Sequence, residues 1–399
     1  MIYLFFTILF LIGTLNYEGG NVVRKNPRYL AVLCLLLTLM SGLQYRMGAD
    51  VISYMKEYTL YNVDYSWEYL SGFDIRQPLW VLLNVLCKTI TEDFLLLKII
   101  QAIFVNIVFF RFYNKYSATP FLSTFLYFII LFLPLNFNEL RQSVAISVFL
   151  LAYDFLIREK YLKYYLLVIV AYLFHESAMI VAVFPLAKFF SLKEKTLLRI
   201  YFLLVLGVII AFSFKDSILS LMLGLLLSTG DSGLITIGER YFDSSLFGGF
   251  EMTIFGMIER VVFIVFYMWI LFFNISKGLV KNRYESFAFV MYLILYILNS
   301  VFPIFYRFGE FYSPFFILLS ANMIYHVAKS FQPRFVGKMA IFFMLFFFAF
   351  ISNKFLFNKA YYGEKPIVQY YPYTSVFDQK LVPARERAFQ DKEDEVVLY

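Results

Sequence analysis

Long apolar runs separated by short polar stretches recur along most of the chain. A helix that crosses a bilayer needs about 20 predominantly apolar residues, and a backbone inside lipid must satisfy its hydrogen bonds within its own helix. The pattern therefore predicts an all-α, polytopic integral membrane protein with about 10–12 transmembrane helices. The predicted crossings lie near residues 2–17, 30–46, 94–112, 120–136, 140–157, 200–214, 254–273, 286–302, 313–328 and 339–357.

Two apolar regions do not fit a simple crossing. Residues 79–90 are too short to span a bilayer, so they predict a re-entrant or interfacial segment. Residues 164–190 are interrupted by the polar triplet His175, Glu176 and Ser177. This interruption favours a short helical hairpin with the triplet near its tip, and a single tilted helix is the alternative.

The composition strengthens the membrane assignment. The chain of 399 residues is 61% hydrophobic and only 16% charged, whereas soluble domains are about half apolar and a quarter charged. Such a chain cannot cover its apolar surface with polar groups, which excludes soluble enzymes and disordered scaffolds. The two cysteines, Cys34 and Cys87, lie in apolar runs and indicate neither a disulfide framework nor a thiolate metal site.

Charge placement predicts the orientation. With the N-terminus outside, the predicted inner loops are mostly basic, as expected of cytoplasmic loops, so the net charge of +7 does not indicate nucleic-acid binding. The outer side then carries loops 46–77 and 215–253, and the domains are a membrane domain of residues 1–357 and an outer tail of residues 358–399. The inner basic residues are Arg24, Lys25, Arg28, Arg111, Lys115, Arg158, Lys160, Lys163, Lys188, Lys193, Lys195, Arg199, Lys277, Lys281, Arg283, Lys329, Arg334 and Lys338.

Ionisable residues at membrane depth are functional candidates, because they are costly unless paired or hydrated. If the second crossing continues past Arg46, then Arg46, Asp50 and Tyr54 share one helix face and form an anion clamp with its own carboxylate. An interfacial anchor is the alternative.

A second candidate follows Pro134, where the sequence predicts the start of a helix. Helix N-termini favour anions, and Arg141 could bind phosphate through two parallel hydrogen bonds. Asn138 could cap this helix, and Glu139 and Gln142 flank the arginine.

The other candidates are His175 with Ser177, and two arginines beside tyrosines. His175 is a candidate general base, while the only other histidine, His326, is expected to be structural. The arginine–tyrosine pairs are Arg240 with Tyr241 and Arg307 with Tyr306. Under the predicted topology Arg46, Arg141, Arg240 and Arg307 all fall on the outer side.

Several arginines among aromatic residues at the outer face fit a lipid-linked phosphate or pyrophosphate. The sequence has no glycine-rich nucleotide loop, HExxH motif or paired DxD motif, which disfavours a nucleotide-sugar enzyme. Transfer from a lipid pyrophosphate needs positive charge on the leaving group and a base for the attacking hydroxyl. We therefore expect no metal and no cofactor.

Three motifs in order resemble those of the EpsG family of Wzy-type polysaccharide polymerases. They are RxGxD from Arg46, NxxRQxxA from Asn138 and FHxSA from Phe174, with less specific similarity at Arg240 and Arg307. The resemblance covers most of the chain. A residue other than Glu176 would be more usual after the histidine, so Glu176 could orient His175 or compete with it.

The resemblance implies a GT-C-like glycosyltransferase with an outward-facing cavity, in the bacterial inner membrane. Its donor and acceptor would be undecaprenyl-pyrophosphate-linked oligosaccharides, and the reaction would be inverting and metal-independent. It implies Arg46, Arg141, Arg240 and Arg307 as pyrophosphate ligands, and His175 as the base ahead of Asp50 and Glu139. The substrate-lining residues would be Tyr54, Asn138, Gln142, Ser177, Tyr241 and Tyr306.

Further partners implied by the resemblance are membrane lipid and a flippase and chain-length regulator of the same lipopolysaccharide or exopolysaccharide pathway. Three alternatives stay open. An O-antigen ligase would use the same donor with a lipid A core as acceptor, and an O-acyltransferase would use His175 on an acyl donor. A lipid-linked oligosaccharide flippase would also need arginines in an aromatic cavity, although it should show internal inverted symmetry.

Overall fold

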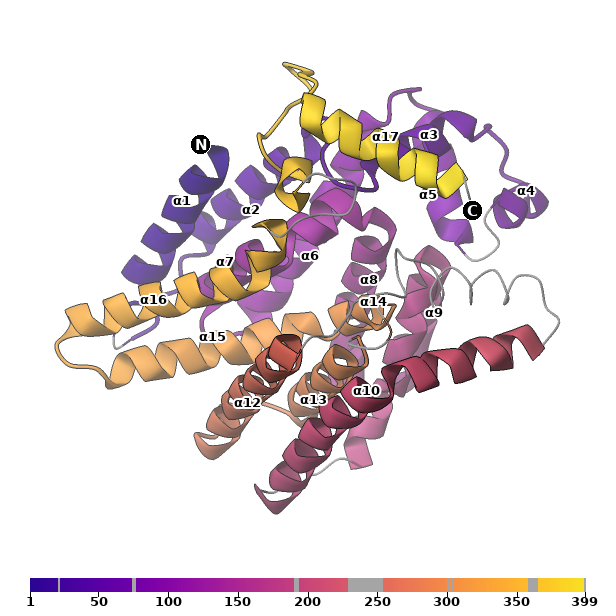
Figure 1. The fold of residues 1–399 in the computed structure, drawn as a ribbon. Coiled ribbons are helices and arrows are strands. Elements are labelled where there is room, and N and C mark those ends of the chain that lie inside the picture. Colours follow the sequence, from indigo (N-terminus) through magenta and orange to yellow (C-terminus); the bar gives the residue numbers. More distant parts are fainter. Residues whose placement is uncertain are drawn as a thin grey trace. The chain divides into compact units, whose positions relative to one another are not determined.

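The computed structural model describes residues 1–20, 22–73, 77–189, 194–228, 254–299, 302, 304–357 and 365–397. These residues are helical apart from turns, loops and one isolated bridge between Gln44 and Ser375. The chain forms two compact units, Met1–Met179 with Ile324–Tyr399, and Ile180–Met323. Figure 1 shows the helices of each unit.

Helices of the first unit pack mainly as neighbouring pairs, α2 on α6, α6 on α8, α8 on α9, and α7 on both α1 and α16. Aromatic side chains fill these contacts, and the Phe10 ring stacks on the rings of Phe125 and Phe128 at 5.5 and 5.2 Å. The helices of this unit are α1 (Ile2–Tyr17), α2 (Pro27–Gly42), α3 (Val51–Leu60), α4 (Trp67–Phe73), α5 (Pro78–Lys88), α6 (Leu95–Tyr116), α7 (Pro120–Ile130), α8 (Leu140–Ile157), α9 (Tyr161–Phe174), α16 (Arg334–Asn353) and α17 (Pro383–Val397), with the π-helical turn η1 (Pro134–Asn138) and the 3-10 turns η4 (Lys354–Phe357) and η6 (Pro366–Gln369).

The second unit has its own aromatic core. The Phe184 and Tyr312 rings stack at 5.4 Å, and the Tyr312 hydroxyl donates to the Ile180 carbonyl at 2.9 Å. Its elements are α10 (Glu194–Ser228, kinked at Phe214), α12 (Ile254–Ser276), α13 (Arg283–Leu298) and α14 (Phe305–Glu310), together with most of η2 (Glu176–Phe189) and of α15 (Ser313–Ser330).

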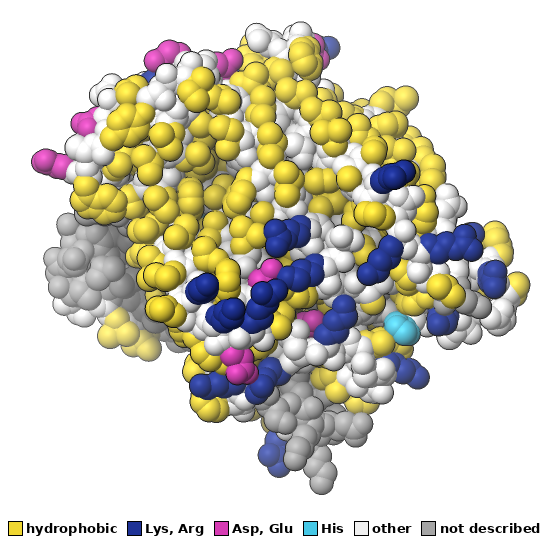
Figure 2. Space-filling model, turned by 180° about the vertical axis from the view of Figure 1, so that it is seen from behind, with side chains coloured by type: hydrophobic (Ala, Val, Ile, Leu, Met, Phe, Trp, Pro, Cys, Tyr) yellow, Lys and Arg dark blue, Asp and Glu magenta, His cyan; other side chains and the backbone are white. Residues whose placement is uncertain are grey.

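Four of the described helices are long and apolar enough to cross a membrane, namely Leu95–Tyr116, Leu140–Ile157, Gly256–Ser276 and Arg334–Phe357. Five shorter apolar helices accompany them. Large hydrophobic side chains are exposed on many helices, and Figure 2 shows wide hydrophobic areas on the surface beside a group of Lys and Arg side chains. The prediction of an all-α, polytopic membrane protein is confirmed.

Two arrangements that the sequence left open do not form. The second crossing ends at Gly42 rather than continuing past Arg46, because residues 43–50 form a loop before α3 begins at Val51. The single tilted helix considered for residues 164–190 is also excluded, since α9 ends at Phe174 and His175 adopts an extended conformation. Residues 79–90, which we predict to be a re-entrant or interfacial segment, lie largely within the short helix α5.

Candidate functional site

The loop between α2 and α3 carries the RxGxD motif in a conformation that requires glycine. Gly48 has φ +100°, and a Cβ there would lie 2.0 Å from the carbonyl oxygen of Phe137. Only glycine adopts this backbone region readily and lets the two chain segments approach so closely. The first motif therefore lies directly against the second.

Asn138 joins these two motifs through its side chain. Its Oδ1 accepts from the backbone N–H of Ala49 at 2.7 Å, and its Nδ2 donates to the Tyr370 hydroxyl. The interpretation of Asn138 as a helix cap is wrong, because α8 has Glu139 at its N-cap and no side-chain cap bond. Asn138 instead links the RxGxD loop, the start of α8 and the tail.

A buried lysine supports the turn that precedes α8. Lys98 of α6 is 1% exposed; its Nζ donates to the Asn136 carbonyl and to Gln101 Oε1 at 3.1 Å. The same Nζ lies 5.7 Å from the centroid of the Phe137 ring. Sequence reasoning missed this residue, although a lone cation in an apolar run is a signal that could have found it.

Arg141 lies against the aromatic ring of Tyr54. Its guanidinium carbon is 5.5 Å from the ring centroid, a cation–π contact between α8 and α3. Burial raises the pKa of Tyr54 to about 12, while the positive charge of Arg141 acts in the opposite direction. The structure thus brings together a predicted pyrophosphate ligand and a predicted substrate-lining residue.

Tyr370 of the tail is a buried tyrosine whose hydroxyl accepts from Asn138. The tyrosine is 3% exposed, and burial raises the pKa of its hydroxyl. The negative charges of Glu139 and Asp50 raise that pKa further, so both carboxylates act electrostatically on Tyr370. Gln142, the neighbour of Arg141, is buried in the first turn of α8.

Arg46 binds the C-terminal helix. Its Nε donates to Glu386 Oε1 at 3.0 Å, and its Nη2 donates to Oε2 of the same carboxylate. Two parallel hydrogen bonds of this kind fix the plane of the guanidinium. Both side chains keep about a quarter of their surface exposed, with fractions of 25% and 26%.

The tail also fixes the backbone of the RxGxD loop. The N–H groups of Gly48 and Tyr45 donate to the carbonyls of Gln369 and Thr374 at 3.0 and 2.9 Å. The buried Arg385 donates to the carbonyl of Arg46 at 3.3 Å. Sequence reasoning assigned no site residue to the tail, because its polar composition gives no periodic signal.

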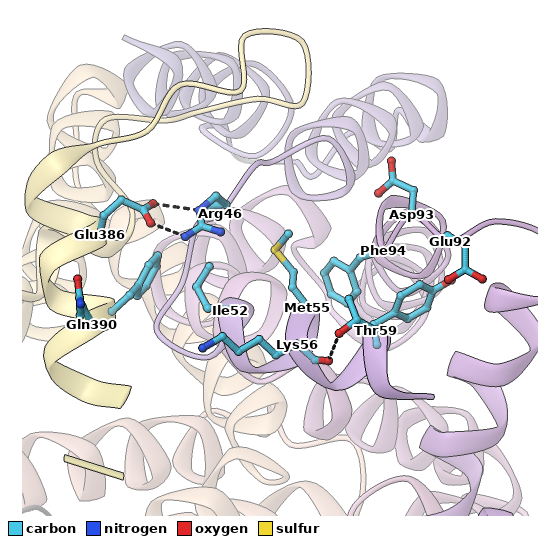
Figure 3. A pocket seen from close by; sticks show the side chains of 12 residues that line it. Arg46, Ile52, Met55, Lys56, Thr59, Glu92, Asp93, Phe94, Glu386 and Gln390 are labelled. Atoms are coloured by element: carbon cyan, nitrogen blue, oxygen red, sulfur yellow. Dashed lines mark hydrogen bonds and ion pairs between the residues drawn. The ribbon is translucent and has the colours of Figure 1, made fainter. Parts of the chain in front are cut away.

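A cavity of about 700 Å³ opens beside Arg46, between α3 and α17. Figure 3 shows Glu386 and Gln390 projecting from α17, with Arg46 bound to Glu386. Its lining combines cationic, carboxylate and apolar side chains, which are Arg46, Ile52, Met55, Lys56, Tyr58, Thr59, Glu92, Asp93, Phe94, Glu386, Phe389 and Gln390.

His175 lies just beyond the end of α9. Its Nδ1 is 2.7 Å from Ser177 Oγ, and the side chain is 5% exposed. The helices α8 and α9 pack along each other and are joined by a short turn at residues 158–160, as Figure 1 shows. His175 therefore lies at the same end of this helical hairpin as Arg141.

The remaining predicted residues do not belong to the described part of the first unit. Arg307 and the 42% exposed Tyr306 belong to α14 in the second unit. Arg240 and Tyr241 lie outside the described residues. The structure thus gathers Arg46, Asp50, Tyr54, Asn138, Glu139 and Arg141 within the first unit, in or around the contact between the first two motifs.

Comparison with known proteins identifies the family. The model of the EpsG family matches residues 28–375, which is most of the chain and includes all three motifs. No curated protein and no solved structure matches. The resemblance seen in the motifs is confirmed, and the chain belongs to the EpsG family, which is of the polysaccharide-polymerase type.

Proposed function

We propose that this protein is a membrane glycosyltransferase that polymerises lipid-linked repeat units. It transfers a growing glycan from undecaprenyl pyrophosphate onto the non-reducing end of another lipid-linked unit, at the outer face of the bacterial inner membrane. The observation that carries this proposal is the direct contact of the RxGxD loop with the start of α8. This contact gathers Arg141, Asp50 and Glu139 around Tyr54 and Tyr370.

The proposed reaction is a displacement at the anomeric carbon. The acceptor hydroxyl attacks this carbon, the bond to the pyrophosphate oxygen breaks, and the configuration inverts. Arg141 stabilises the negative charge that grows on the leaving pyrophosphate, because a guanidinium stays protonated and can hold two oxygens at once. We keep Arg240 and Arg307 as further pyrophosphate ligands.

The acceptor hydroxyl must lose its proton to a base. His175 is the first choice, because an imidazole can take up a proton near neutral pH; its Nδ1 accepts from the backbone N–H of Ser177 at 3.3 Å and lies 2.7 Å from Ser177 Oγ. Asp50 and Glu139 are the alternative bases, since both act on Tyr370 beside the motif contact. In either case the side chain takes up the hydroxyl proton, and undecaprenyl pyrophosphate departs as the anion.

Metal independence is part of the proposal, because arginine can supply the positive charge that a metal ion would otherwise bring to the pyrophosphate. Purified protein treated with a chelator should keep its rate of polymerisation. A rate that falls and returns on adding a divalent cation would contradict the arginine-only mechanism.

The decisive experiment uses purified protein with lipid-pyrophosphate-linked oligosaccharide, and products are sized on a gel. A ladder of lengthening products supports the polymerase. Transfer to a lipid A core alone would indicate an O-antigen ligase. Movement of unchanged substrate across a vesicle membrane would indicate a flippase. A flippase and a chain-length regulator of the same pathway are the expected cellular partners of the polymerase.

A further inference from the structure

The cavity between α3 and α17 lies beside the motif contact and is separated from Arg141 by α3. Residues at positions i, i+3, i+4 and i+7 of a helix share a face, and Ile52, Met55, Lys56 and Thr59 follow this spacing along the cavity. Tyr54 faces Arg141 instead. The helix α3 therefore presents one face to the proposed reaction centre and another to the cavity.

The charges that line the cavity are mixed. Arg46 and Lys56 are cationic, whereas Glu92, Asp93 and Glu386 are carboxylates. These carboxylates would repel a polyanion such as pyrophosphate, because like charges are unfavourable at close range. A lining that offers both donors and acceptors instead suits a neutral ligand that is rich in hydroxyl groups.

The floor of the cavity is apolar. Phe389 of α17 packs in one cluster with Val51 and Ile52, and Met55 and Phe94 lie against it. Most ligand pockets combine such an apolar surface with a few polar groups, and this cavity has a volume typical of them. A sugar ring has the matching surface, with C–H groups on its faces and hydroxyls on its edge.

One wall of the cavity comes from residues beyond the family match. The matched residues end at 375, whereas α17, which supplies Glu386, Phe389 and Gln390, begins at Pro383. This wall is joined to the matched part of the chain through the Arg46–Glu386 pair. The shape of the cavity thus depends on a segment outside the region that identifies the family.

Building on the function proposed above, we propose that the cavity between α3 and α17 binds sugars of the acceptor glycan remote from the reacting bond. In this arrangement α17 is the specificity-determining wall that selects the repeat unit. Lys56 and Gln390 supply hydrogen bonds to sugar hydroxyls, and the cluster around Phe389 packs against a ring face.

Binding can be measured without catalysis. The probe is the free repeat-unit oligosaccharide, released by mild acid from the lipid-linked substrate and titrated calorimetrically into the full-length protein in detergent. The double variant Lys56→Ala, Gln390→Ala should weaken binding about ten-fold, as expected for two lost hydrogen bonds. Gln390→Trp, which narrows the cavity at the α17 wall, should weaken binding further. Lys380→Ala, at an exposed tail position outside the cavity lining, is the matched control and should bind normally.

Three outcomes would overturn the proposal. The first is that the oligosaccharide does not bind the unsubstituted protein. The second is that the double variant and Gln390→Trp bind it as tightly as the unsubstituted protein does. The third is that inorganic pyrophosphate displaces it. The gel assay separates this proposal from the polymerase function. If the cavity variants weaken oligosaccharide binding but the protein forms no ladder, only the polymerase function is contradicted. If the protein forms a ladder but the cavity variants bind normally, only the proposal for the cavity is contradicted.

Discussion

Arg46 and Arg141 belong to two motifs that touch in the structure, but their side chains have different partners. Arg141 lies on the ring of Tyr54, and both residues belong to the region matched by the EpsG family. Arg46 makes two hydrogen bonds to Glu386, which lies beyond that region. Similar side chains in touching motifs therefore have different partners, an aromatic ring for Arg141 and a carboxylate of the C-terminal helix for Arg46.

This comparison predicts which variants affect chemistry and which affect glycan binding. Changes on the Arg141 side of α3 should reduce turnover. Changes on the Arg46 side should alter acceptor use more than the rate of the chemical step. The expected effects decrease from the proposed base to the ion pair with the tail.

The largest effect is expected for His175→Ala. Removing a general base costs roughly 10²–10⁴-fold in rate, so ladder formation should nearly stop while protein abundance in the membrane is unchanged. Initial rates on purified variant measure this loss. Ser177→Ala, which removes only the group bonded to Nδ1, should cost much less. A full rate in His175→Ala would move the base to Asp50 or Glu139.

The second-largest effect on activity is expected for Arg141→Lys. The variant keeps the charge but loses the planar fork, and losing a transition-state hydrogen bond typically costs roughly 10²–10³-fold. Polymer length should collapse while single-unit glycolipid persists, as seen on a gel of extracted glycolipids. Arg46→Lys is the matched variant and should be less severe. Normal long chains from Arg141→Lys would remove that residue from the proposed mechanism.

The apolar runs predicted the positions of the helices well, because burial in lipid or in a bundle leaves a strong pattern in the sequence. The residues 140–157 predicted as a crossing form α8, and those at 2–17 form α1. The loop before α3 was harder to predict. An apolar run indicates where a helix can form, whereas the loop after α2 places Gly48 against Phe137, a residue far along the chain.

The site was predicted only in part, because the sequence shows which residues are unusual but not which distant segments they contact. Charged residues in apolar surroundings pointed to Arg46 and Arg141, but not to the segments that hold them. Arg46 meets Glu386 across a sequence separation of 340 residues, and no local pattern reports such a contact. Asn138 shows the converse, since an asparagine before a helix is typical of a cap but here bonds to Ala49 and Tyr370.

A third prediction tests the contact between the two motifs. Gly48→Ala would force a residue with a side chain to φ +100° and push its Cβ against the Phe137 carbonyl. Backbone strain alone costs about 1–3 kcal/mol, and the clash adds to it. The melting temperature in detergent should fall clearly, and activity should fall with it.

Gly278→Ala is the matched control for that prediction. Gly278 also has positive φ, +64°, but a Cβ there would meet no atom within 4 Å. Its melting temperature should fall less than that of Gly48→Ala. Equal losses in the two variants would show that strain rather than the motif contact determines the effect.

The smallest effect is expected for Glu386→Gln. The Arg46–Glu386 pair is partly exposed, and such pairs contribute about 0.2–1 kcal/mol, so the melting temperature should change little. Other bonds, including that from Arg385 to the Arg46 carbonyl, still hold the tail to the loop. Chain extension should slow only a few-fold at saturating acceptor, and the difference from the natural sequence should shrink in high salt. Glu68→Gln removes a charge at an exposed site in α4 and serves as the control. A loss as large as that of Arg141→Lys would contradict the contrast between the two arginines, because it would place the tail carboxylate in the chemistry itself.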